Sequence, residues 1–209
     1  MQGAGSGIAS RIDGEVGLHS RGPIAYPEGS MATATTSIRD PRTFASPAEW
    51  ARDVVGVAQH GGPLAAVYLR GRLDATLRER VMVAVSRVNA CGGCTFVHQR
   101  WALRAGVSSE ELEAIGLGDL AALDERSRAA VVYASALAGA RFRAPIAPEI
   151  AVAAEGHLTV DEMSAVEAVA RLMALANLSV STAEAIAARA RRPTMTGSPR
   201  VGESRTRPR

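Results

Sequence analysis

The sequence predicts an all-α fold, a bundle of packed helices that assembles into an oligomer. Of the 209 residues, 47% are hydrophobic but only 4% are aromatic, and alanine is abundant. Alanine favours helices, whereas strands are enriched in β-branched and aromatic residues. Helix start and stop signals also recur between residues 41 and 190. We therefore expect one helical domain over residues 41–190, since this length suits a single core.

The two ends of the chain differ from this domain in composition. Residues 1–40 are rich in Gly, Ser, Thr and Ala without a sustained apolar period, and Met31 is a candidate for the true start. Residues 191–209 hold six Arg and one Glu, a charge of +5, so the net +3 of the chain leaves −2 on residues 1–190. We predict a disordered N-terminal extension and a basic, disordered C-terminal tail.

The sequence carries no recognisable signal for export or for insertion into a membrane. No basic segment leads into an apolar stretch as in a secretory signal, and no segment reaches the roughly 18 apolar residues of a membrane span. We therefore expect a cytoplasmic protein with no membrane partner. In a reducing compartment, two cysteines indicate catalysis or metal binding more than a structural disulfide.

The domain is expected to open with a helix at Ser46-Pro47-Ala48-Glu49. Ser46 is a good N-cap, Pro47 suits the first helical position, and Glu49 places an acid in the first turn. Gly61-Gly62-Pro63 is predicted to end this helix. A short helical segment over residues 64–70 is then expected to follow.

Residues 75–88, capped by Asp74, allow two interpretations. Val81, Val83 and Val85 alternate as in a strand, but the apolar residues also fit one helical face: Leu77, Val81, Ala84 and Val88. Length and the helical character of the neighbouring segments favour a helix.

Glycine at positions 92 and 93 is expected to break this helix, because glycine is a poor helix former. A new helix is predicted over residues 94–104, and Ser108 and Glu111 form a capping box for another. Further helices are expected over residues 125–138, 148–155 and 161–189. The segment 165–178 is apolar nearly all round except for an i,i+4 pair, Glu167 and Arg171, so it should be buried centrally or between subunits.

The chemistry concentrates between Glu79 and His98. Cys91 and Cys94 form a C-x-x-C pair, and Cys94 should lie at a helix N-terminus, where unpaired N–H groups stabilise a thiolate. His98 lies one turn further on the same face, and Glu79 on the preceding helix can orient it as a base. Cys91 can then close a disulfide onto oxidised Cys94. These four residues are the predicted catalytic set, with no cofactor and no metal.

Other roles for these residues stay open at this point. The pair can be half of a zinc site, with Glu79, His60 or His157 completing four ligands, or two inert buried cysteines. Residues 102–112 also resemble the corner of a helix-turn-helix. A recognition helix there would carry glutamates at positions 110, 111 and 113, which phosphates repel, so no nucleic-acid partner is expected.

The spacing Glu79-x11-Cys91-x2-Cys94-x3-His98 resembles the core motif of the alkylhydroperoxidase D-like, or carboxymuconolactone decarboxylase, family. The flanking sequences RERVMVAVSRVNACGGC and ALRAGVSSEELEAI are also similar to it, and the resemblance extends over residues 45–188. It implies an all-α fold, trimers or hexamers, and a peroxidase. Its disulfide would be reduced by a dithiol such as the lipoamide of a partner protein.

By position, the resemblance makes Cys94 the thiol that attacks peroxide and Cys91 the resolving thiol, with Glu79 and His98 as a proton relay. The sequence departs from the family at Gly93, where the best-studied relay has another histidine. The alternatives on the same scaffold are a decarboxylase, whose branch typically lacks the cysteine pair, and a disulfide reductase.

Overall fold

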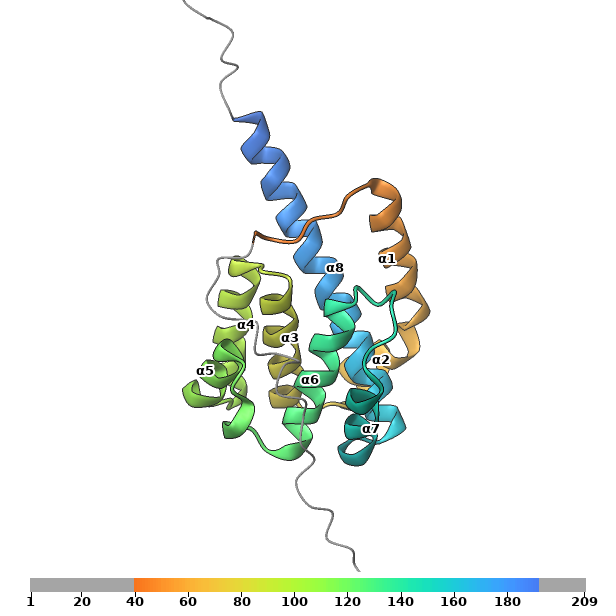
Figure 1. The fold of residues 1–209 in the computed structure, drawn as a ribbon, viewed down its shortest axis with the longest axis vertical. Coiled ribbons are helices and arrows are strands. Elements are labelled where there is room, and N and C mark those ends of the chain that lie inside the picture. The colour runs from red at the N-terminus through yellow and green to blue at the C-terminus, as the bar shows by residue number, and fades with distance from the viewer. Residues whose placement is uncertain (1–39, 192–209) are drawn as a thin grey trace, which may run out of the picture.

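The computed structural model describes residues 40–191, and this part of the chain consists of eight α-helices and one short 3-10 helix, with no strand (Figure 1). The all-α prediction is therefore confirmed. The predicted disordered ends lie outside the described residues, apart from residues 40 and 191. The elements are α1 (Pro47–Gln59), α2 (Gly61–Arg70), α3 (Ala75–Val88), α4 (Gly92–Ala105), α5 (Ser109–Leu117), η1 (Leu120–Ala122), α6 (Glu125–Gly139), α7 (Pro148–His157) and α8 (Val160–Ala190).

Three helices, α3, α6 and α8, form the centre of the bundle and pack on one another. Helices α4 and α5 pack against α3 on one side, and α1 and α2 pack against α8 on the other (Figure 1). The side chains between the central helices are aliphatic and fully buried, among them Leu77, Val81, Val131, Val166 and Val169. Burial of this apolar surface is the main favourable term in folding. The bundle thus fixes α3, the helix that carries Glu79.

The starts of α1, α3 and α5 are placed where the sequence predicts them. The Ser46 hydroxyl accepts a hydrogen bond from the Glu49 N–H at 3.2 Å, and Ser108 and Glu111 form the expected capping box. Helix α3 spans Ala75–Val88, with the Asp74 carboxylate accepting from the Leu77 N–H at 2.8 Å. Residues 81–85 are therefore helical, and the strand interpretation is wrong.

The glycines were predicted to end helices, but they lie in the first turns of new ones. Helix α2 begins at Gly61 instead of residue 64, and α4 begins at Gly92 instead of residue 94. Glycine costs a helix about 0.5–1 kcal/mol in conformational entropy but keeps its N–H group. It therefore weakens a first turn without preventing the helix from starting there.

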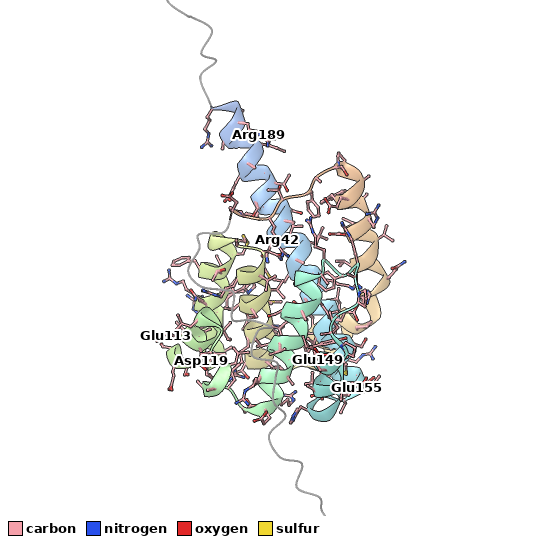
Figure 2. All side chains as sticks on the ribbon, in the orientation of Figure 1. Arg42, Glu113, Asp119, Glu149, Glu155 and Arg189 are labelled. Carbon is pink, nitrogen blue, oxygen red and sulfur yellow. A yellow bond between two sulfur atoms is a disulfide. The ribbon has the colours of Figure 1, made fainter. Side chains whose placement is uncertain are left out.

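Helix α8 is the longest element, with 31 residues. Its length and composition suffice for a membrane span, so the expectation that no segment reaches this length of apolar residues was wrong. Inside the bundle, however, Val166, Val169 and Met173 are buried against the other central helices, as in a core helix. The end that carries Arg189 projects past the bundle (Figure 2).

Candidate active site

The turn between α3 and α4 is held by backbone hydrogen bonds. The Cys91 N–H donates to the Ser86 carbonyl at 3.0 Å, and the Arg42 N–H donates to the Asn89 carbonyl at 3.0 Å. Ala90 has a φ of 54°, in the left-handed region that costs a non-glycine residue about 1–2 kcal/mol. The turn is therefore a defined conformation that sets the position of Cys91.

Both cysteines lie at the N-terminus of α4. Cys91 is the N-cap residue, Cys94 is the third residue of the helix, and the two sulfur atoms form a disulfide. Cys91 precedes both glycines and lies just outside the helix, which begins at Gly92. The two thiols also differ in exposure, since Cys91 is 3% exposed and Cys94 is half-buried.

Gly93 lies between them in the first turn of α4, on the surface. A Cβ atom added at this position would meet nothing within 4 Å. The glycine is therefore not required by packing, and the space beside the disulfide can hold a side chain.

The base and the carboxylate of the predicted site are brought together. His98 Nδ1 lies 2.9 Å from Glu79 Oε2, and both residues are buried. An ionised carboxylate can only accept a hydrogen bond, so Nδ1 carries the proton and Nε2 of the neutral imidazole is the basic nitrogen. His98 lies one turn after Cys94 on α4, which places it on the face of that thiol. The arrangement can take a proton from a thiol at Nε2 while Glu79 stabilises the charge formed.

Three further residues surround this pair and were missed from the sequence. The Arg78 guanidinium lies 3.4 Å from Glu79 Oε1 and also 5.4 Å from the centre of the Tyr68 ring. Burial raises the pKa of the Tyr68 phenol above its usual value, with Arg78 opposing this shift and Glu79 adding to it. The Trp101 ring meets His98 edge-on at a centroid distance of 5.0 Å. Of these three residues, only Trp101 could have been found from helical spacing, since it lies three residues after His98 on α4.

The other residues considered as zinc ligands lie elsewhere. His60 Nε2 is 3.5 Å from Glu167 Oε1 on α8, and His157 is the last residue of α7. Across residues 40–191 there is no group of three or more His, Cys, Asp or Glu side chains that could hold a metal ion.

The corner expected for a helix-turn-helix is present between α4 and α5, but the exposed charged side chains of α5 are acidic. Helices α4 and α5 meet at Gly106, which has a φ of 97°. Glu113 is exposed on α5 (Figure 2), and Glu111 is occupied by its capping box and by Arg80, whose Nη2 lies 2.6 Å away. An acidic surface of this kind repels phosphates.

Comparison with known families bears on the segment that contains the site. Residues 63–136 match the family model described as the carboxymuconolactone decarboxylase family. Residues 63–136 are therefore similar to this family. The matched segment runs from α2 into α6 and contains Glu79, both cysteines and His98. No curated protein matches the chain.

Proposed function

We propose that this protein, which is similar to the carboxymuconolactone decarboxylase family over residues 63–136, is a thiol peroxidase that works through a Cys91–Cys94 dithiol and disulfide cycle. The observation that carries the proposal is the buried hydrogen bond of 2.9 Å between His98 Nδ1 and Glu79 Oε2, with His98 on the helix whose N-terminus holds the Cys91–Cys94 disulfide. A buried carboxylate–imidazole pair one helical turn from a helix-terminal thiol supplies what a nucleophilic sulfur needs, a base and anion stabilisation.

The first step joins Cys94 to the peroxide. His98 Nε2 accepts the thiol proton, the thiolate attacks the terminal oxygen of ROOH, an S–O bond forms and the O–O bond breaks. The leaving alkoxide takes a proton from His98 and departs as an alcohol, which leaves Cys94 as a sulfenic acid. Cys94 is assigned this role because it is the more exposed thiol and shares a helix face with His98.

The second step closes the disulfide. The Cys91 sulfur attacks Cys94, the S–O bond breaks, and the hydroxide takes up the Cys91 proton and leaves as water. A dithiol then reduces the disulfide by exchange and is itself oxidised, so ROOH and R′(SH)₂ give ROH, water and the R′ disulfide. We propose a dihydrolipoyl group, free or on a partner protein, as this reductant.

Titration of accessible thiols tests the cycle. The reduced chain should lose both thiols on addition of one equivalent of organic hydroperoxide, and dihydrolipoamide should restore both. If peroxide leaves the two thiols unchanged while a small disulfide oxidises them, the protein is a disulfide reductase and the peroxidase proposal is wrong.

A further inference from the structure

A cavity lies on the far side of the bundle from the disulfide. It has a volume of about 250 Å³ and lies between α1, the turn that follows α6, and α8. Helices α1 and α4 lie on opposite sides of the central helices (Figure 1), so this cavity is separate from the redox centre. The charged residues of its wall are four arginines and one acid: Arg52, Arg141, Arg143, Arg171 and Asp53.

Two carboxylates that do not line the cavity fix three of these guanidinium groups. Glu49 is buried and lies 2.7 Å from Arg143 and 3.2 Å from Arg141, and Glu167 lies 2.7 Å from Arg171. With Glu49, Glu167 and Asp53 counted, the set carries four positive and three negative charges. At the cavity wall, however, four guanidinium groups face a single carboxylate, so the wall is positive. Arg141, Arg143 and Arg171 are held in place before any ligand arrives.

Arg52 differs from the other three arginines, each of which is paired with a carboxylate. Its side chain lies on the exposed face of α1, and it forms no hydrogen bond or ion pair with residues 40–191. Arg143, by contrast, also bonds Asp53 at 3.0 Å. Arg52 therefore has its donors available for a ligand at this rim.

The turn after α6 contributes two residues with positive φ to the lining of this cavity. Arg141 and Phe142 have φ values of 54° and 55°, two successive residues in the region that favours glycine. Such strain persists where the surrounding structure over-determines it, often at ligand sites. Here it places one guanidinium at the wall and the Phe142 ring beneath Arg171, 4.6 Å from its guanidinium carbon. The lining also has an apolar part, with Phe142, Val55 and Ala174.

We propose that this cavity is a binding site for a small organic anion. Its carboxylate or phosphate group would accept hydrogen bonds from the arginines, which present a rigid fork of donors suited to either group. A short apolar portion would lie against Phe142, Val55 and Ala174. The site is independent of the thiol chemistry proposed above, because it shares no residue with it.

Isothermal titration calorimetry of the full chain at low salt, with succinate, inorganic phosphate and butyrate as probes, tests the proposal. Saturable binding of succinate or phosphate is expected, and the tighter of the two identifies the head group. Butyrate compared with succinate measures the gain from a second carboxylate. Arg52→Gln should weaken binding about tenfold, the loss of one charge-assisted hydrogen bond.

Arg104→Gln is the matched control, since Arg104 is exposed at the end of α4, away from the cavity. It changes the net charge equally and should leave binding unchanged. Arg171→Gln, checked for native helix content by circular dichroism, should weaken binding at least as much as Arg52→Gln. The proposal is overturned if no probe binds saturably, if the Arg104 and Arg52 variants weaken binding equally, or if neither cavity variant weakens it.

Discussion

Replacement of Glu79 by glutamine tests the proposed proton relay in isolation. The side-chain oxygen of the glutamine can still accept the hydrogen bond from His98 Nδ1, so the 2.9 Å contact and the ring orientation are kept while the negative charge is lost. A hydrogen bond to a charged group contributes about 1.5–3 kcal/mol. Because Glu79 and His98 are both buried, little of this is screened by water.

The charge of Glu79 stabilises imidazolium, which forms only when His98 takes the thiol proton. The loss should therefore slow the reaction of reduced protein with peroxide by about tenfold to a hundredfold, at about 1.36 kcal/mol per factor of ten. Stopped-flow measurement of peroxide consumption under single-turnover conditions gives this rate directly. The variant should still form the Cys91–Cys94 disulfide at the end of the reaction.

Glu113→Gln is the matched control, because Glu113 is exposed on α5 and its loss changes the net charge equally. It should react at the wild-type rate. In a double-mutant cycle, Glu79→Gln should add little to the defect of His98→Ala, since the two residues act as one unit. A Glu79→Gln rate equal to that of the control would refute the relay.

The other predictions concern the helix that carries Glu79, the first turn of α4, and assembly. Burial alone would raise the pKa of Asp74, but hydrogen bonds from Thr76, the Leu77 N–H and Arg126 outweigh it and lower this pKa from 3.8 to about 2. A lowered pKa adds stability above pH 3.8 that is lost as the pH falls toward 2, so Asp74→Ala should cost about 1 kcal/mol at pH 7 and little at pH 2 in urea denaturation; an equal cost at both pH values would contradict this. Gly93→His should fold normally, because a Cβ there meets open space, and should raise the single-turnover rate by supplying the histidine that the family relay has between its cysteines; an unchanged rate would show that this position takes no part. Sedimentation equilibrium should give a trimer or a multiple of it, whereas a monomer at micromolar concentration would show that the exposed apolar side chains of the bundle, such as Leu69 and Ile186, are not subunit contacts.

Local signals explain why so much of the fold could be predicted. Ser46, Ser108 and Asp74 each cap a helix through a hydrogen bond to a backbone N–H three residues on, so each start is encoded within one turn. The proximity of His98 to the thiols follows in the same way from helical spacing. The choice between helix and strand was harder to predict at residues 81–85, because the alternating valines fit a strand equally well. Only the packing in the bundle decides between the two.

Contacts between distant segments could not be predicted from spacing. Tyr68 reaches the site through Arg78, and Glu49 pairs with Arg143 across 94 residues of sequence. Such pairs depend on how α1, α2 and the turn after α6 pack, which no local pattern specifies. Gly92 misled the prediction of the α4 start, because glycine is unfavourable inside a helix but tolerated in a first turn. Because α4 begins at Gly92, Cys91 is its N-cap residue.

The central claim is that Cys94 attacks the peroxide and Cys91 resolves the sulfenic acid. Trapping of sulfenic acid in the two serine variants tests this most directly. Cys91→Ser should react once with peroxide, leave a trappable sulfenic acid on Cys94, and fail to turn over with dihydrolipoamide. Cys94→Ser should not consume peroxide, because Cys91 is buried and lies a turn further from His98. Sulfenic acid on Cys91 in the Cys94→Ser variant, with Cys91→Ser inactive, would reverse the assignment, and no reaction difference from wild type in either variant would show that the thiols are structural.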